Sequence, residues 1–259
     1  MFGSKPKVAH SVSFVKDPNG AAANDLVSLE KAGHVSLAKR AKDAGVALAN
    51  RGLAGVRAEG VLIVDHSGSM HGDYNSGAVQ TLAERFLGFV LQFDVDGNVP
   101  IVAFDDRVHE EVVADVTNYQ GIIEREIRLN GRRQMGGTDL RPPLKWLREK
   151  AKTTKAPIFA ALVSDGDNSN DRHDAETEEL FYDLSRYPVF IKPLLVRPVE
   201  FFSKIDKYSG PKRLLDNVNA QASTHTRNLL TCDDSTFADA MAEEWDTWVA
   251  AATAAGVLR

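Results

Sequence analysis

The stretch Val61-Leu62-Ile63-Val64-Asp65-His66-Ser67-Gly68-Ser69 decides how this chain folds and where its chemistry lies. Its four apolar residues predict a buried β-strand, and Gly68 with the two serines predicts a tight turn directly after that strand. Asp65, Ser67 and Ser69 stand at every second position, so they direct three oxygen atoms into one small volume. Carboxylate and hydroxyl oxygens are the ligands that hard divalent cations prefer. The stretch therefore predicts a cation-binding turn at a strand end.

Two further polar segments complete the predicted site. Gly136-Gly137-Thr138-Asp139 is a flexible turn that supplies a hydroxyl group, and Ser164-Asp165-Gly166-Asp167 follows the apolar run 158–163. Mg2+ takes an octahedral shell of oxygen ligands, so one turn with a single carboxylate is not a whole site. The absence of thiolates favours Mg2+, or else Mn2+ or Ca2+, over Zn2+. The residues expected to hold the ion are Asp65, Ser67, Ser69, Thr138 and Asp165.

Strand-like and helix-like segments alternate along the chain. Short apolar runs predict strands at 61–64, 99–104, 158–163, 189–196 and 213–216. Helical spacing of apolar residues predicts helices at 37–53, 78–93, 119–129, 142–151, 174–185, 199–208 and 237–254. Strands that are apolar on both faces and separated by helices are typical of a parallel sheet covered on both sides. The predicted fold class is α/β, a doubly wound, mostly parallel central sheet flanked by helices. Ligands of such sheets bind at the carboxyl ends of the strands.

The length and composition fit one large α/β domain. The chain has 259 residues, of which 43% are hydrophobic and 26% charged, enough for a full core. Its net charge is -5 and its basic residues are scattered, which argues against general binding to nucleic acid or to an anionic membrane. No signal-like segment and no apolar run near the roughly 20 residues of a membrane span are found. With one cysteine, Cys232, we expect a cytoplasmic protein without an internal disulfide.

The order of the three metal-binding segments resembles a known site. Asp-x-Ser-x-Ser, then Thr about 70 residues later and Asp about 100 residues later, is similar to the metal-ion-dependent adhesion site of von Willebrand factor A (vWA) domains. The resemblance implies a Rossmann-like vWA fold. It also implies that Ser67, Ser69 and Thr138 contact the ion, while Asp65 and Asp165 act mainly through water. In such domains the protein leaves one coordination position free, and a partner carboxylate fills it.

Segments outside the metal motifs extend the resemblance to the TerF-like vWA proteins of tellurite resistance and related bacterial stress systems. The resemblance runs from residue 26 to the last residue, and its landmarks are 27–31, 52–57, 94–100, 118–121, 215–217, and 244–248 with 254–256. Two segments depart from the family pattern. Trp245-Asp246 replaces a Phe-Pro pair, and Arg197-Pro198 replaces a glycine-rich loop. Neither departure is expected to touch the ion, so both bear on the partner. Such modules also occur in phage genomes, so a bacterial or a phage setting is expected.

The chain is expected to divide into an arm and one domain. Residues 1–25 are predicted to be a flexible N-terminal arm, because 17–20 reads as a turn and an alanine-rich segment follows it. We expect the arm to become ordered against a partner or a neighbouring subunit, which makes it a candidate for self-association. Residues 26–259 are predicted to be a single vWA domain with an N-terminal helical extension and a C-terminal closing helix.

Enzyme sites built on the same residues fit the sequence less well. A phosphate-binding loop is disfavoured, because the chain has no Gly-Lys pair and no G-x-G-x-x-G pattern. A nucleophile elbow needs glycines two positions before and after its serine, where Ser67 has Asp65 and Ser69. A phosphoaspartate phosphatase needs a second carboxylate where Ser67 stands. We therefore expect that the chain is not an enzyme.

Other metal sites also fit less well. Residues 165–176 have the spacing of an EF-hand calcium loop, but a β-rich run precedes them and Arg172 occupies a position that needs an apolar residue. His66, His71 and His173 have no cysteine nearby, so we interpret them as solvated loop histidines and not as zinc ligands. A helix N-cap would explain the serine turn alone, but not the two downstream segments.

The expected function is a non-enzymatic, divalent-cation-dependent protein-binding module that serves as an adaptor or scaffold. An Asp or Glu carboxylate of a partner protein would complete the coordination of the ion. Arg132 and Arg133 precede the Thr138 turn and Arg141 follows it, so they are expected to attract that acidic segment. Two alternatives remain open. One is a metal-dependent hydrolase or phosphatase that uses the ion as a Lewis acid. The other is a structural assembly protein with an incidental metal site.

Overall fold

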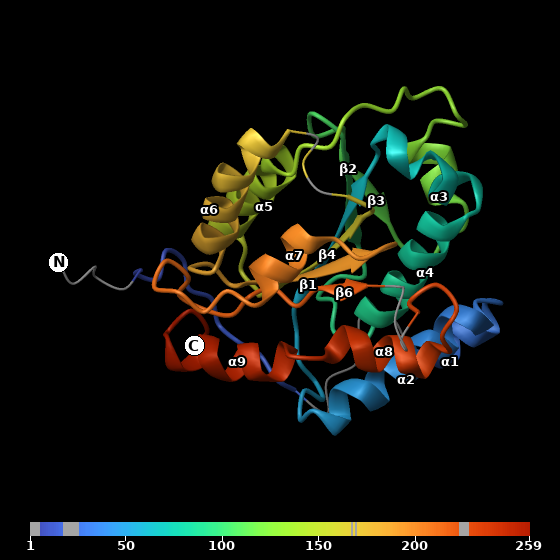
Figure 1. The fold of residues 1–259 in the computed structure, drawn as a ribbon. Helices are drawn as coiled ribbons and strands as arrows, with labels where there is room; N and C mark the ends of the chain where they lie inside the picture. Colours follow the sequence, from blue (N-terminus) through green and yellow to red (C-terminus); the bar gives the residue numbers. More distant parts are fainter. Residues whose placement is uncertain (1–5, 18–25, 167, 169, 223–227) are drawn as a thin grey trace.

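The computed structural model describes residues 6–17, 26–166, 168, 170–222 and 228–259. Within these residues the chain forms one six-stranded sheet in the order β3-β2-β1-β4-β5-β6 (Figure 1). The strands are β1 (Glu59–Asp65), β2 (Val99–Phe104), β3 (Val112–Ala114), β4 (Ile158–Ser164), β5 (Val189–Leu195) and β6 (Gln221–Ala222). Only the edge pair β2 and β3 is antiparallel. The predicted doubly wound, mostly parallel sheet is therefore confirmed.

The strand order reverses at β1, and this reversal positions the predicted site. β1 pairs in parallel with β2 on one side and with β4 on the other. The chain thus builds one half of the sheet outward from β1 and then returns to build the other half from β4. Loops that leave β1 and β4 at their carboxyl ends diverge to opposite sides and open a crevice. Asp65 ends β1 and Asp165 follows β4 directly, so both reach this crevice.

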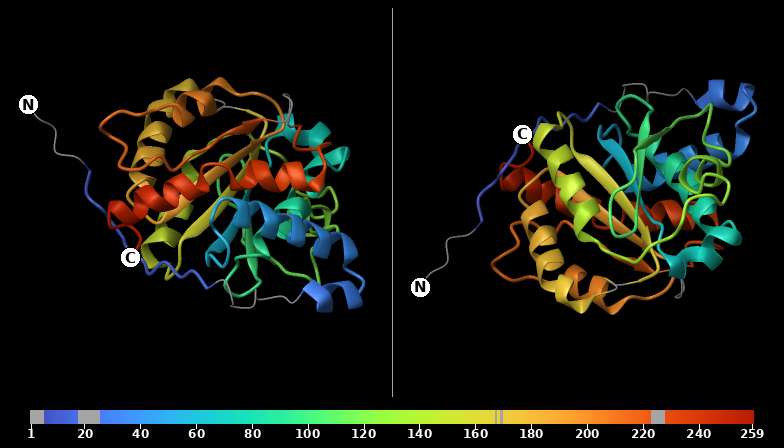
Figure 2. Two further views of the ribbon diagram at one scale, coloured as in Figure 1. Left: turned by 90° about the horizontal axis from the view of Figure 1, so that it is seen from below. Right: turned by 90° about the horizontal axis from the view of Figure 1, so that it is seen from above.

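Helices cover both faces of the sheet (Figures 1 and 2). The longer ones are α2 (Val35–Asn50), α4 (Ala78–Val90), α5 (Arg141–Thr153), α6 (Asp174–Leu184), α8 (Asp234–Ala242) and α9 (Trp245–Ala254). The shorter ones are α1 (Leu26–Lys31), α3 (His71–Asn75) and α7 (Glu200–Asp206). Buried side chains of α2, α4, α8 and α9 pack on one face, and those of α5, α6 and α7 pack on the other. Among the described residues, no helix is long and apolar enough to cross a membrane.

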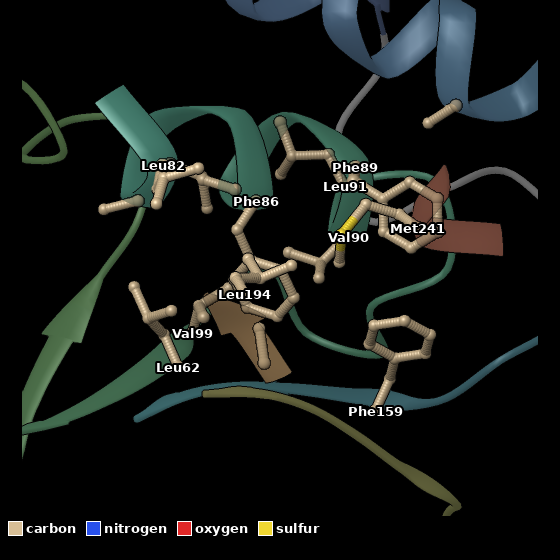
Figure 3. Close-up of a cluster of buried hydrophobic side chains, with 14 of the residues drawn as sticks. Leu62, Leu82, Phe86, Phe89, Val90, Leu91, Val99, Phe159, Leu194 and Met241 are labelled. Atoms are coloured by element: carbon tan, nitrogen blue, oxygen red, sulfur yellow. The ribbon is translucent and has the colours of Figure 1, made fainter. Parts of the chain in front are cut away.

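The core explains why the strands are apolar at every position. In β1, Leu62 and Val64 face α4, whereas Val61 and Ile63 face the layer of α5 and α6. Figure 3 shows side chains of α4 and α8 gathered above β4, with Phe159 among them. The Phe159 ring contacts several aromatic rings, those of Phe86, Phe89, Phe93, Phe190 and Trp245. Burial of each such ring stabilises the fold by about 1.5–3 kcal/mol, so β1 and β4 are a rigid base for the loops that follow them.

The helix predicted at 119–129 is wrong in extent. Only a short π-helical turn, η2 (Ile123–Ile127), forms there. Leu129 and Asn130 have left-handed backbone angles, with φ values of 52° and 54°, which no right-handed helix can continue. The edge strand β3 was not predicted either, because its three residues are too few to show a clear pattern.

The strand predicted at 213–216 is also wrong. Arg213 is buried there, and its Nη1 donates to the backbone oxygens of Ile205 and Tyr208 at 3.1 and 3.0 Å. These bonds hold the segment as a loop that satisfies the carbonyl groups at the end of α7. The outer strand of this half of the sheet is instead β6, a few residues later.

The closing helix predicted at 237–254 is broken into α8 and α9. Glu244 has a left-handed φ of 64°, so the chain turns between the two helices. At this break the Nζ of the buried Lys192 in β5 donates to the Glu243 carbonyl at 3.0 Å. Lys192 also donates to Asn219 Oδ1. Lys192 in β5 thus stabilises the turn between α8 and α9. Trp245 and Trp248, which follow the turn in α9, are fully buried.

Residues 6–17 lie against the domain, and the expectation of a loose arm does not describe them. Val12 is buried, and its backbone pairs with Leu258. Ala9 N donates to Arg186 O at 3.0 Å. These contacts join segments that are remote in the sequence, so local pattern could not reveal them. The rest of the expected arm, residues 1–5 and 18–25, lies outside the described residues.

Lys192 gives the stability of the fold a specific pH dependence. Burial lowers its pKa from 10.5 to about 7. Between these two values the folded chain binds one proton fewer than the unfolded chain. The free energy of unfolding should therefore rise with pH in this window, by at most about 1.4 kcal/mol per pH unit.

This dependence is checked by denaturant unfolding of Lys192→Met, which keeps the apolar stem. The gain in stability of the variant over the natural chain should be largest below pH 7 and should shrink as pH rises towards 10.5. Asn219 Oδ1 still accepts a bond from Gln221 Nε2 at 2.8 Å in the variant. A stability difference that does not change with pH would contradict the assignment.

Candidate metal centre

Asp65 is the fixed point of the predicted site. Its side chain is fully buried, and Oδ1 accepts a hydrogen bond from Ser67 N at 2.8 Å. Oδ2 accepts one from Ser164 Oγ at 2.7 Å, so the carboxylate is held by groups that follow β1 and end β4. Burial raises the pKa of Asp65 to about 6. A carboxylate that is oriented this firmly and is deprived of water is stabilised by a nearby cation.

The hydroxyl groups of the turn connect Asp65's strand to Asp165. Ser67 Oγ and Ser69 Oγ lie 3.1 Å apart, and Ser69 Oγ donates to Asp165 Oδ1 at 2.9 Å. Asp165 follows β4, the strand next to β1 in the sheet, although it lies 100 residues after Asp65 in the chain. The structure therefore brings four of the five predicted ligands into direct contact.

Thr138 is placed at the same edge by the loop that carries it. Gly68 N donates to Gly136 O at 2.9 Å, and Ser67 and Gly136 form a backbone bridge. A side chain at position 136 would bring its Cβ within 2.9 Å of Asp105 Cβ, so only glycine allows this close approach. Thr138 itself is buried. The loop thus packs against the serine turn at Gly136, and Thr138 follows two residues later in the sequence.

The residues present fit a hard divalent ion. They offer two carboxylates and three hydroxyl groups, with no nitrogen or sulfur among them, which is the donor set of Mg2+, Mn2+ or Ca2+. Within the described part of the chain, Asp165 Oδ2 accepts no hydrogen bond although its side chain is buried. Asp65, Ser67, Ser69, Thr138 and Asp165 would hold the ion. The ion would supply a positive charge and an open coordination position. Asp167, from the same segment as Asp165, lies outside the described residues.

Arg197 lies at this site, where no contact was expected. Its Nη1 is 2.9 Å from Asp165 Oδ2, and its Nη2 donates to Asp73 Oδ2 at 2.9 Å. The contact with Asp165 is an ion pair without hydrogen-bond geometry. The Arg197-Pro198 departure from the family pattern therefore sets a guanidinium against a predicted ligand carboxylate. This arginine and a bound cation compete for the same negative charge.

The other arginines near the site differ from one another. Arg141 forms ion pairs within the protein, because it donates to Asp139 Oδ2 at 2.7 Å and to Glu176 Oε2 at 2.8 Å. Arg133 is partly buried, whereas Arg132 is exposed. Of the three arginines predicted to attract a partner, Arg132 is therefore the one placed most freely at the surface.

The histidines do not all fit the interpretation of solvated loop residues. His66 is fully buried, and its ring packs against the rings of Tyr74 and His109. Burial lowers the pKa of His66 to about 4. Sequence reasoning missed its neighbours Asp105 and His109. A signal was present, since Asp105 directly follows β2 as the serine turn directly follows β1.

Removal of the Arg197 charge should strengthen cation binding. A half-exposed ion pair contributes about 1 kcal/mol, so Arg197→Ala should lower the dissociation constant for Mg2+ or Mn2+ by roughly fivefold. Arg197→Lys, which keeps the charge, is the matched control and should bind like the natural chain. Isothermal titration calorimetry measures both. Equal or weaker binding by Arg197→Ala would show that the arginine does not oppose the cation.

Three solved structures that are similar to this chain have low sequence identity to it. The ArnB paralog VWA2 of Sulfolobus acidocaldarius is 17% identical, with a TM-score of 0.41 over 63% of this chain and 41% of that chain. Proximal thread matrix protein 1 of the mussel byssus, with a zinc-occupied MIDAS motif, is 17% identical, with a TM-score of 0.46 over 71% and 46%. Manganese-loaded Plasmodium vivax TRAP protein is 14% identical, with a TM-score of 0.46 over 72% and 72%. This chain spans less than half of the first two proteins.

Sequence comparison gives the family. The uncharacterized protein YcbR of Bacillus subtilis (strain 168) is 26% identical over 226 residues, which are 84% of this chain and 88% of that protein. The model of the family described as vWA-TerF-like, the vWA domain found in the TerF C terminus, matches residues 57–258. That match includes all five predicted metal ligands and every strand of the sheet. The chain therefore belongs to the vWA-TerF-like family.

Proposed function

We propose that this chain is a divalent-cation-dependent protein-binding module that holds a partner through the ion. The observation that carries the proposal is the contact of Asp65, Ser67, Ser69 and Asp165 at the carboxyl ends of two adjacent strands. These oxygens would leave part of the ion's coordination shell open. Because Asp65 and Asp165 supply only two negative charges, and Arg197 offsets part of them, an incoming Asp or Glu carboxylate is bound strongly.

The surroundings of the site support an adaptor or scaffold and not an enzyme. Both oxygens of Asp65 are engaged in hydrogen bonds, which makes this carboxylate a poor nucleophile. Ser67 Oγ bonds to Ser69 Oγ, and within the described residues neither ring nitrogen of His66 has a hydrogen-bond partner. His66 is therefore not a base for Ser67. We propose that the module acts in the cytoplasm, in a bacterial or phage stress-response or assembly system, as its TerF-like family suggests.

Metal binding is tested first. Titration calorimetry of the natural chain with Mg2+ or Mn2+ should show one weak site at this edge of the sheet. Asp65→Ala should lose it, because the variant lacks the carboxylate that orients Ser67 and Ser164. Asp96→Ala, which removes an exposed carboxylate in the turn before β2, should bind normally. Unchanged binding by Asp65→Ala would remove the basis of the proposal.

Partner binding is tested by affinity capture from cells of the source, with Mg2+ and with EDTA. Thr138→Ala should lose the captured partner, because it removes one ligand hydroxyl, whereas Thr138→Ser should keep it. Binding should weaken as salt rises, since an ion and an acidic segment attract each other through charge. Arg132→Glu should slow association, because Arg132 is exposed and precedes the loop that carries Thr138. A partner that binds equally well in EDTA, or that ignores Thr138→Ala, would contradict the mechanism.

The absence of catalysis is a separate expectation. Purified chain with Mg2+ or Mn2+ should hydrolyse ATP, p-nitrophenyl phosphate and p-nitrophenyl acetate no faster than buffer does. The reason is that both oxygens of Asp65 accept hydrogen bonds, Ser67 Oγ bonds to Ser69 Oγ, and in the described residues His66 makes no hydrogen bond to Ser67. Metal-dependent turnover that disappears in Ser67→Ala would establish a hydrolase or phosphatase instead.

A further inference from the structure

A second group of metal-ligating side chains lies behind the serine turn. His66 follows β1, Asp105 follows β2, and His109 lies in the return towards β3. One ring nitrogen or carboxylate oxygen from each of them lies within 4.8 Å of the other two. His109 Nε2 is 3.0 Å from Asp105 Oδ2, and the rings of His66 and His109 meet edge to face with centroids 6.0 Å apart.

His66 lacks the partners that a buried imidazole needs. An imidazole carries at least one N–H group in either protonation state, so burial without an acceptor costs about 1–3 kcal/mol. His66 is fully buried, and among the described residues neither of its ring nitrogens has a hydrogen-bond partner. The ring instead packs edge-on against Tyr74, at a centroid distance of 5.3 Å. A ligand outside the polypeptide would satisfy one of these nitrogens.

The donor set differs from that of the predicted metal centre. Two imidazoles and one carboxylate suit Zn2+, which is a softer ion than Mg2+. Around a tetrahedral zinc ion with bonds of about 2.1 Å, ligand atoms lie roughly 3.4 Å apart. The pair formed by His109 and Asp105 is already near that spacing. An ion between them would replace the proton that they share, and His66 would close the third corner.

The charges that face the cluster are mixed. Arg128 and Arg133 bring positive charge near His66, and Asp105 brings negative charge. Arg128 is balanced by Glu124, because its Nη1 donates to Glu124 Oε2 at 3.0 Å. Near His66 this leaves the positive charge of Arg133 and the negative charge of Asp105, which oppose each other, so a divalent ion would enter a nearly neutral surrounding. Such a setting allows zinc binding without the high affinity of a thiolate site.

We propose that His66, Asp105 and His109 form a second metal site that binds Zn2+, with water as the fourth ligand. The site is separate from the oxygen-only centre but shares its loops. His66 stands between Asp65 and Ser67, Gly136 packs on Asp105, and Asp105 O accepts a hydrogen bond from Asp139 N at 3.0 Å. Zinc at this position would fasten together the ends of β1 and β2 and the loop that carries Thr138.

The test uses the metal-free full chain with excess Mg2+, so that the oxygen-only centre is filled first. Zn2+ is then measured by equilibrium dialysis, and Co2+ serves as a visible probe of nitrogen ligation. We expect one Zn2+ per chain and a Co2+ d–d absorption band. His109→Gln and Asp105→Asn should each weaken Zn2+ by roughly tenfold or more, since even loss of an outer partner of a ligand costs that much. Asp105→Asn keeps the acceptor for Arg107 N at 3.1 Å, so folding is preserved.

Two variants separate this site from the others. His71→Gln changes an exposed histidine that contacts Asn75, and it should leave Zn2+ binding unchanged. Ser69→Ala removes a hydroxyl of the oxygen-only centre and should also leave it unchanged. Zinc that is lost in Ser69→Ala but kept in His109→Gln would place the ion at the serine turn and overturn the proposal. Failure to retain any Zn2+ under excess Mg2+ would overturn it as well, with water then as the partner of His66.

Discussion

A buried carboxylate at the end of the central strand is the constraint on which the rest of the structure depends. Asp65 cannot be hydrated where it lies, so the surrounding chain must supply hydrogen bonds and positive charge. Ser164 from β4 and the backbone of Ser67 supply the hydrogen bonds, which couple two strands that are distant in the chain. Arg197 supplies positive charge to Asp165, the second carboxylate of the predicted site. Hydrogen bonds and an ion pair thus fix both carboxylates at the crevice.

Pattern in the sequence predicted those parts of the fold whose cause is local. Buried strands such as 158–163 and amphipathic helices such as 78–93 can be predicted, because the spacing of their apolar residues shows which faces are buried. The serine turn and Asp165 could also be identified, since polar residues directly after buried strands must emerge at the carboxyl edge of the sheet. Their meeting in the structure follows from the strand order, which the alternation of strands and helices already favoured.

The parts that could not be predicted depend on contacts between remote segments. The break between α8 and α9 contains no glycine or proline, and it is supported by Lys192 from another strand. Val12 finds its place only because Leu258 is beside it. Arg197 is one residue in a loop, and nothing local shows that it reaches Asp165. His66 was predicted to be a solvated loop residue. Its burial depends on segments that are remote in the sequence, such as the end of β2 and the Gly136 loop that packs on it.

The fastening of residues 8–16 has a mechanical consequence. Val12 runs parallel to Leu258, Phe14 N donates to Arg259 O, and His10 contacts the carbonyl of Thr154, which precedes β4. These contacts lie at the amino ends of the strands, opposite the metal crevice. Tension between residue 6 and residue 259 would load the parallel bonds in shear, the geometry in which several bonds resist together. Under the proposed function, a partner bound at the carboxyl edge of the sheet would instead pull along β1 and β4. Force can thus act on the sheet at two separate places, the crevice at its carboxyl edge and the paired segments 12–14 and 257–259 at its amino edge.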